Sequence, residues 1–456
     1  MKCVRRGSVQ DQFSLLLGIF VFGAGLAGCK PPNFPEGCRP QDLASPTPKS
    51  EARVEFGAEF TITKESMREA LFSNNISLLS GINQVHQAKN QLGVARGNLL
   101  PSLGLSQLLF TAGSPVFALA AVEMLLPFLA PSNWFSYFEN VALWKAEIVA
   151  LRALKLNLLA SGLSLFTTLA SDAGLLPIYE AEVTDLREIQ VEVTEAHHAG
   201  LATKEELELA TSQLHTAELS SRLVRELIGS EIAAIRHALA APVSTDLKWE
   251  TPAITESVLE AIAVAAGPIE PVVDQAVANG PEALQLEFLL KAAKLNKWKA
   301  VFSFISGASA SGTPSSAFSD LAVGVSAGIG FGYVPSIRLT ERNQIELDLR
   351  LRELRLESTE IVEATFEMHR SARDRLILAE AIEKSTHAYY DAKHAQYISG
   401  MDTLGVMLQA RSKWRQASIK ILEARAQIEQ TRITLNRIAL TGEFTGVDSC
   451  DLSALQ

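Results

Sequence analysis

The sequence predicts a mainly α-helical protein with a small β part, built from two copies of a long antiparallel helical hairpin. Three observations predict this class. Motifs around Gly200 recur around Gly400, apolar residues after each glycine keep a heptad spacing, and two long segments are almost free of charge. The chain has 456 residues, of which 47% are hydrophobic and only 20% charged, so it can bury a large core.

The N-terminus has the pattern of a targeting segment, which we assign to residues 1–28. Its basic start is followed by an apolar run of about 14 residues, Phe13 to Leu26, which is short for a transmembrane helix. The run ends at Leu-Ala-Gly-Cys29, which resembles a bacterial lipobox, and Cys29 is therefore the expected lipidation site. The alternative is an ordinary secretory signal in which this cysteine occurs by chance.

Residues 29–57 are expected to form a tether, because proline is frequent from Pro31 to Pro48 and such a segment cannot bury a core. Lys30 follows Cys29 where many inner-membrane lipoproteins have Asp, and this likeness indicates the outer membrane. Cys38 and Cys450 would be the remaining thiols of the mature chain. They could form a disulfide in an oxidising compartment or stay unpaired in the two tails.

The rest of the chain is a tandem duplication. Gly400, Thr403 and Ala410 lie 200 residues after their counterparts Gly200, Thr203 and Ala210. The first repeat is placed at residues 58–250, the second at 251–443, and a C-terminal tail at 444–456.

A heptad seam follows each glycine. The seam steps by three and four residues in both copies, which predicts helices packed side by side as in a coiled coil. Its positions are Leu207, Ala210, Leu214, Ala217, Ser221, Val224 and Ile228 in the first copy, and Met407, Ala410, Trp414, Ala417, Ile421, Ala424 and Ile428 in the second.

A long helix precedes each glycine turn. One is expected from about Ser136 to His198, with a kink or break at Gly174 and Pro177, and the other from about Leu339 to Tyr397. The second would be roughly 90 Å long at 1.5 Å per residue. Glycine at each turn permits a positive φ, and Thr203, with Asp402 or Thr403, can cap the returning helix.

The uncharged segments precede the long helices. They run from Gly97 to Phe138, interrupted by Glu123, and from Val301 to Ile337, interrupted by Asp320. Each can be divided into two strands of about ten residues, a length that suits a tilted strand in a bilayer, although parts could equally be helical. Four strands cannot close a barrel, so the strand interpretation requires several chains to share one.

Other chemistry is not indicated. The net charge of −10 argues against a nucleic-acid partner, and phosphate-binding, hydrolase and zinc-protease motifs are absent from the sequence. The eight histidines lack metal-ligand spacing; His197 and His198 are expected at a solvated helix end. We therefore expect no enzyme, no catalytic residue, no cofactor and no metal site.

The chain resembles the TolC-like outer-membrane factors, the exit ducts of tripartite efflux pumps and type I secretion systems, as a lipoprotein subtype. The resemblance rests on the duplication, on "ARGNLLPSLGLS", and on the glycine turns "AGLATKEELELA" and "SGMDTLGVMLQA". It implies a homotrimer in which four strands per chain form a 12-stranded outer-membrane β-barrel, continued by a periplasmic α-barrel.

The resemblance also assigns candidate residues and partners. It implies that a periplasmic adaptor docks at the tips Gly200, Leu201, Gly400 and Met401, and that an inner-membrane pump or ABC transporter supplies the driving force. Relatives often carry an Asp after the second tip glycine, where this chain has Gly405 and Gln409. Asp402 is the acidic residue near that tip, and it is the candidate for a periplasmic constriction.

Two further interpretations stay open. The chain could be a non-pore coiled-coil scaffold lipoprotein of the outer membrane, for which uncharged segments would have no use. It could also be a family member that assembles but is gated shut. The cargo cannot be read from these residues.

Overall fold

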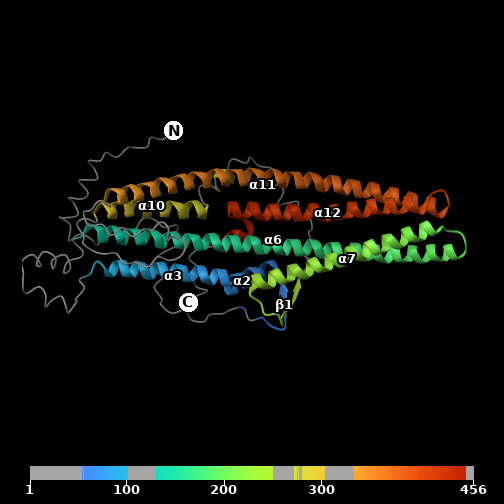
Figure 1. Cartoon of the computed structure of the whole chain (residues 1–456), viewed down its shortest axis with the longest axis horizontal. Helices are drawn as coiled ribbons and strands as arrows, with labels where there is room; N and C mark the ends of the chain where they lie inside the picture. The colour runs from blue at the N-terminus through green and yellow to red at the C-terminus, as the bar shows by residue number, and fades with distance from the viewer. Residues whose placement is uncertain are drawn as a thin grey trace, which may run out of the picture. The chain divides into compact units, whose positions relative to one another are not determined.

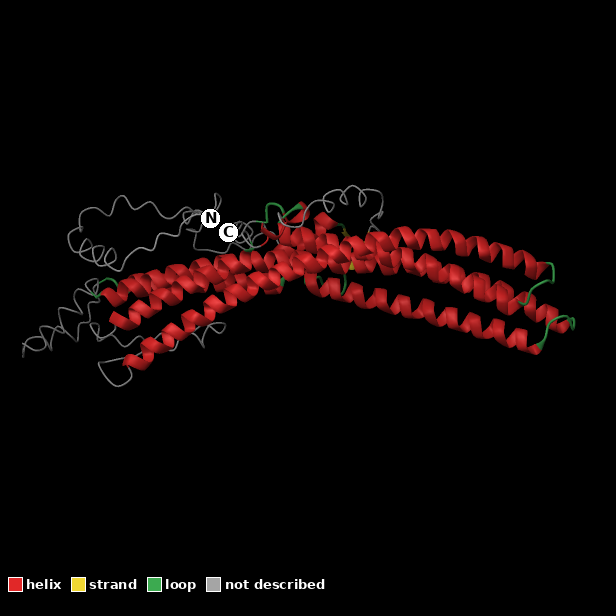
Figure 2. Cartoon of the chain, turned by 90° about the horizontal axis from the view of Figure 1, so that it is seen from above, coloured by secondary structure: helices red, strands yellow, loops and turns green. Residues whose placement is uncertain are grey.

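The computed structural model describes residues 54, 56–100, 130–249, 272–274, 276, 280–302 and 333–447. Helices dominate them (Figures 1 and 2). In chain order the elements are β1 (Glu59–Ile62), α2 (Lys64–Asn74), α3 (Ile76–Gly97), α6 (Pro131–His198), α7 (Lys204–Leu239), β2 (Asp246–Trp249), α10 (Pro281–Phe302), α11 (Tyr333–Ile398), α12 (Leu404–Ala439) and the 3-10 turn η2 (Gly442–Phe444).

The duplication is visible in the helix lengths. α3 and α10 have 22 residues each, α7 and α12 have 36 each, and α6 and α11 have 68 and 66. Within each copy the chain therefore passes from a shorter helix to a long one and returns through a third. The predicted order of helices in each repeat is confirmed.

The two returning helices also end in the same way. Ala240 after α7 and Leu440 after α12 both adopt the left-handed conformation, with φ of 51° and 55°. The next amide in each copy closes the turn: Ala241 N donates to Arg236 O at 3.0 Å, and Thr441 N to Asn436 O at 2.9 Å. This is the hydrogen-bond pattern of a helix C-cap that normally favours glycine.

The heptad seam forms the contact inside each hairpin, where α6 packs on α7 and α11 on α12. Most of its predicted positions are buried, as the coiled-coil spacing requires. The buried members are Ala210, Leu214, Ala217, Ser221, Val224 and Ile228 in α7, and Met407, Ala410, Ala417, Ala424 and Ile428 in α12.

α6 corrects one expectation, because it continues without a break from Pro131 to His198 and contains Pro177 in its interior. Leu175, Leu176 and Tyr179 pack against the buried core, and a Cβ at Gly174 would lie 3.6 Å from Leu422 of α12. Packing on both sides therefore supports the helix across the position where proline removes a backbone donor. By length and composition α6 could also span a membrane, but half of that apolar window is buried against other helices.

The long helices also begin earlier than predicted. α6 starts at Pro131 and α11 at Tyr333, so 131–138 and 333–337, which the strand interpretation included, are helical. Proline suits the first turn of α6, where its missing N–H has no intrahelical partner. The remaining parts of the expected strands, and residues 1–28, lie outside the described residues.

A small parallel sheet joins the two ends of the first repeat. β1 pairs with β2 in the register Phe60 to Leu247 and Ile62 to Trp249. Ile62 and Leu247 are buried in the core that α2, α6, α7 and α12 complete. The sheet brings the start and end of this repeat together beside α2.

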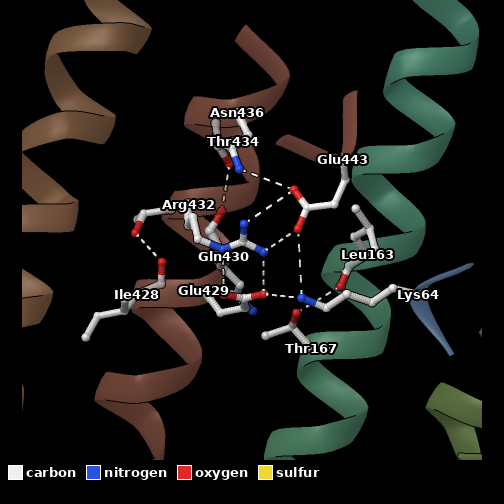
Figure 3. A network of polar contacts seen from close by, with 11 residues as sticks. Lys64, Leu163, Thr167, Ile428, Glu429, Gln430, Arg432, Thr434, Asn436 and Glu443 are labelled. Atoms are coloured by element: carbon white, nitrogen blue, oxygen red, sulfur yellow. Dashed lines mark hydrogen bonds and ion pairs between the residues drawn. The ribbon is translucent and has the colours of Figure 1, made fainter. Parts of the chain in front are cut away.

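A charged network ties the N-terminal helix α2 to the end of the chain (Figure 3). Arg432 of α12 donates to both carboxylate oxygens of Glu429 at 2.7 and 2.8 Å, and to Glu443 of η2 at 2.7 Å. Lys64, the first residue of α2, lies 2.9 Å from Glu429. Burial opposes ionisation of Glu429, but the hydrogen bonds from Arg432 and Lys64 outweigh it and lower its pKa to about 2.

Candidate docking site at the hairpin tips

Two glycine turns form the tips, and they lie at the same end of the helices (Figures 1 and 2). Gly200 and Gly400 have φ of 76° and 73°, a conformation that suits glycine. In each turn the glycine amide donates to the carbonyl three residues back, and the following amide, of Leu201 or Met401, donates to the carbonyl five residues back at 2.8 Å. The chain thus reverses through a Schellman turn.

The returning helices are capped differently. Thr203 and Glu206 form a capping box at the start of α7, in which each side chain accepts from the other residue's amide. Thr403 occupies the same place before α12 without a side-chain cap. Asp402 is bonded instead to Lys393 of α11, with 2.8 Å between Oδ2 and Nζ. That hydrogen bond raises the pKa of Lys393 and places a cation beside Asp402.

Exposed apolar side chains mark both tips. The residue after each glycine is open to solvent, with 83% of Leu201 and 75% of Met401 exposed, and Ile398 just before the second turn is also exposed. A Cβ added at either glycine would meet no atom within 4 Å, so space does not restrict these positions. Apolar groups presented in this way suit contact with another protein.

The two tips are held together by a shared core. Leu186, Ala210 and Leu214 of the first hairpin are buried with Leu404 and Met407 of the second. At Gly405 a Cβ would lie 3.6 Å from Leu209. The hairpins therefore end as one packed unit that presents both tips in fixed relation.

An ionic clamp joins the two hairpins a few helical turns away from the tips. It is composed of Asp185, Arg411 and Arg415. Arg411 and Arg415 of α12 both donate to Oδ2 of Asp185 on α6, the second at 2.9 Å. Only 3% of the Arg411 side chain is exposed, and burial lowers its pKa. Burial also raises the pKa of nearby Glu182, against the attraction of the two guanidinium groups.

An aromatic cluster braces the second hairpin beside this clamp. Tyr390 of α11 stacks on Trp414 of α12 at 5.4 Å, and His387 packs on the same indole at 4.4 Å. Trp414 Nε1 donates to Glu383 at 2.7 Å. The guanidinium of Arg415 lies 4.5 Å from the centre of the indole ring, so the cluster also positions one arm of the clamp.

Of the predicted tip residues, Gly200 and Leu201 lie in the first glycine turn, and Gly400, Met401 and Asp402 lie in or directly after the second. His197 and His198 end α6 as expected, and among the described residues no group of His, Cys, Asp or Glu could hold a metal ion. Cys29, Cys38 and Cys450 lie outside the described residues, so lipidation and the disulfide stay predictions.

The ionic clamp was not foreseen from the sequence. Arg411 and Arg415 are four residues apart and flank the heptad seam, a spacing that would have suggested a shared partner across the seam. Nothing in the sequence identifies Asp185 as that partner, because it lies in a helix rich in acids. Only the packing of α6 on α12 brings the three side chains together.

Comparisons with known proteins agree with this geometry. Residues 311–440 match the family model "Outer membrane efflux protein", while no curated protein matches the chain. Among solved structures, a study of CusC and transmembrane channel formation gives a TM-score of 0.66 at 12% identity, covering 83% of this chain and 92% of that one. The Campylobacter jejuni CmeC outer membrane channel gives 0.62 at 14%, covering 90% and 94%.

A third relative is the open state of the Neisseria gonorrhoeae MtrE outer membrane channel, with a TM-score of 0.60 at 12% identity and coverage of 87% and 96%. At these identities the likeness shows the fold. The family and the structural relatives are channels and efflux proteins, not enzymes. Residues 311–440 therefore match the outer membrane efflux protein family, and the chain has the fold of these outer-membrane channels.

Proposed function

We propose that this protein is the outer-membrane exit duct of a tripartite efflux or type I secretion system. It would work as a homotrimer whose helices extend into the periplasm. The observation that carries the proposal is the pair of duplicated hairpins, which share the channel fold and end in two adjacent exposed tips. The second repeat, over which the family model matches, supplies one of these tips.

Transport through the duct would be passive. The sequence has no phosphate-binding loop that could couple nucleotide hydrolysis to movement. An inner-membrane pump or ABC transporter would therefore provide the energy, and a periplasmic adaptor would connect it to the tips. Leu201 and Met401 are the side chains best placed for that contact, because both project from positive-φ turns into solvent.

The test is to purify the protein from outer membranes, measure its mass by native mass spectrometry, and record conductance in planar bilayers. A trimer that conducts would support the duct. A monomer that leaves the membrane once the lipid anchor is removed, and that does not conduct, would instead favour the coiled-coil scaffold lipoprotein. A trimer without conductance would indicate a channel that is gated shut.

The proposal includes a lipid anchor on Cys29, followed by the proline-rich tether. Cys29→Ser should abolish incorporation of labelled palmitate and alter sorting, while trimer formation and conductance persist. Cys38→Ser is the matched control, because it changes a cysteine nine residues away and should leave labelling intact. Palmitate labelling of Cys29→Ser at the normal level would contradict the anchor.

Asp402 is proposed as an acidic element of a constriction at the second tip. Its bond to Lys393 offsets its charge, so any block of cations there should be weak. Lys393→Gln should strengthen such a block. Conductance of that variant in the presence of divalent cations measures the effect.

A further inference from the structure

A surface of mixed aromatic and basic side chains lies opposite the tips, on the starts of α6 and α11 and from the middle of α10 to its end. We call it the collar, composed of Trp134, Phe138, Lys291, Lys294, Trp298 and Arg338. These helix ends adjoin, in the sequence, the uncharged segments that precede the long helices. Figure 1 shows α10 beside the first part of α11 and of α6.

The aromatic side chains of the collar are exposed to solvent, but ring stacking fixes their orientation. Trp134 and Phe138 are four residues apart on α6 with ring centroids 6.2 Å apart, and Phe138 is 47% exposed. Beneath them Phe135 stacks on Phe302 of α10 at 5.6 Å and on Trp298 at 6.5 Å. Trp298 nevertheless keeps 45% of its surface exposed, so stacking orders the rings without covering them.

The basic part shares a face with the aromatic part. Lys291, Lys294 and Trp298 are spaced by three and four residues on α10, which puts them on one side of the helix, and all three are exposed. Arg338 is exposed in the second turn of α11. Within the described part of the chain, no ion pair links Lys291, Lys294 or Arg338 to an acid.

Two acids at this level, Glu139 and Glu341, are paired with lysines, and burial raises the pKa of a third, Glu147. Glu139 of α6 is largely buried and accepts from Lys299 at 3.1 Å and from Asn296 at 2.7 Å. Glu341 of α11 is paired with Lys297 at 3.0 Å. The lysines that remain add to one positive field, and burial together with the charge of Lys291 lowers the pKa of Lys145.

The opposite end of the first hairpin has the reverse charge. Glu205, Glu206 and Glu208 begin α7, and Glu192 and Glu195 end α6. The whole chain carries a net charge of −10, so the excess of cations at the collar is a local feature and not a property of the composition. Of these two described ends, the collar end therefore suits an anionic surface.

Exposed indoles beside unpaired lysines are the side chains that favour the boundary between lipid headgroups and water. The indole buries an apolar ring and keeps a polar N–H in the wet layer, and basic residues are attracted to anionic lipids. A second copy of the chain fits less well, because Glu139 and Glu341 are already paired within the chain and are not available to basic residues of a neighbour. We propose that the collar binds the anionic phospholipid headgroups of the bilayer in which the channel sits.

This inference rests on the proposed function, since it places these helix ends at the membrane. It adds a ligand class, anionic phospholipid, and the residues that select it. Binding at the collar would fix the depth of the helices in the membrane independently of the Cys29 anchor.

The first experiment compares lipid binding by Lys291→Gln/Lys294→Gln with that of the wild-type channel by native mass spectrometry, using phosphatidylglycerol and phosphatidylcholine. At about 1 kcal/mol per basic residue, the double variant should bind phosphatidylglycerol roughly 30-fold more weakly, with phosphatidylcholine unchanged. Lys413→Gln/Lys420→Gln on α12 is the matched control, because both lysines are exposed on the tip half of the protein. Equal loss in both double variants, or none in either, would overturn the collar.

The second experiment uses tryptophan fluorescence in vesicles that contain brominated phosphatidylglycerol. The chain has five tryptophans, so variants that keep only Trp298 or only Trp414, with the others changed to Phe, report one site each. Trp298 should be quenched strongly and Trp414 weakly. Equal quenching overturns the inference, and protection of Trp298 from both lipid and soluble quenchers would indicate a chain–chain interface instead.

The two proposals can fail separately. A trimer that conducts but shows no preference for phosphatidylglycerol removes the collar and keeps the duct. A monomer that never conducts, but whose Trp298 meets anionic lipid, removes the duct and keeps the collar as a lipid-binding surface.

Discussion

Arg411 on the second hairpin donates to Asp185 on the first, across 226 residues of sequence, and its guanidinium is almost completely buried. Arg415 donates to the same carboxylate oxygen. The two hairpins are thus joined near their tips by an ion pair in which the charged Arg411 side chain is removed from water. A buried charge of this kind is strongly destabilising once its ionic partner is removed.

Asp185→Asn should therefore loosen the tips. The substitution leaves the buried Arg411 without its counter-charge, and we expect the free energy of unfolding to fall by about 1–3 kcal/mol. Circular dichroism during thermal unfolding measures the loss, and hydrogen exchange should show faster opening at the tip end of α12.

The control for this prediction is Glu180→Gln. Glu180 pairs with Arg225 at 2.7 Å, but both side chains are about half exposed, so that pair contributes only about 0–1 kcal/mol. If both variants lost the same free energy of unfolding, burial of Arg411 would not explain the contribution of the ionic clamp to stability.

The network in Figure 3 predicts a loss of stability in acid. The pKa of Glu429 is lowered to about 2 in the folded chain. Ionised Glu429 therefore contributes fully to the free energy of unfolding above pH 4.5, and this contribution is lost as the pH falls toward 2. The size of this contribution is on the order of 3 kcal/mol.

Glu429→Gln provides the measurement. In urea unfolding at pH 7 the variant should be less stable than the wild type, and the difference should shrink steadily between pH 4.5 and pH 2. A difference that stays constant over this range would mean that the ionised carboxylate is not the stabilising group.

Glu231 of α7 predicts the opposite dependence on pH. Burial, then the charge and hydrogen bond of Asp172, raise its pKa to about 7. Its contribution to stability is therefore complete below pH 4.5 and is lost as the pH rises through 7. Glu231→Gln should raise the Tm relative to the wild type at pH 8 and leave it unchanged at pH 4.

The matched control for this change is Glu226→Gln, an exposed carboxyl on the same helix. Its effect on the Tm should not vary between pH 4 and pH 8. If the effect of Glu231→Gln on the Tm were also independent of pH, burial and Asp172 would not be raising the pKa of Glu231.

The second tip predicts a defect in export without a defect in assembly. Gly400→Val forces a β-branched residue into a positive φ of 73°, at a cost of roughly 1–2 kcal/mol, and should distort the turn that presents Met401. Export should fall, while native mass spectrometry still shows a trimer.

Gly229→Val is the corresponding control, because Gly229 lies within α7 and a Cβ there also meets open space. It should leave both export and assembly unchanged. Normal export by Gly400→Val would argue against adaptor docking at this tip.

The sequence predicted the helices more completely than the contacts between them. The steps of three and four residues identified Ala210, Leu214 and Ala217 as buried, because one face of a helix must cover its neighbour. Thr203 was placed correctly as the cap at the start of α7 by local geometry alone. Such features depend on residues a few positions apart.

The features that the sequence did not predict depend on residues far apart in the chain. Pro177 predicted an interruption of α6, but packing against the core supports the helix. The short strands β1 and β2 went unrecognised, although Phe60 and Ile62 alternate with polar residues, because four residues give too weak a pattern. Asp185 could not be matched to Arg411 because their meeting depends on how one hairpin packs on the other.

The left-handed caps at Ala240 and Leu440 bear on how the two copies diverged after the duplication. These two positions, 200 residues apart, hold the same uncommon backbone conformation with different side chains, and neither is glycine. The copies have therefore diverged in residue identity while the path of the chain has stayed the same.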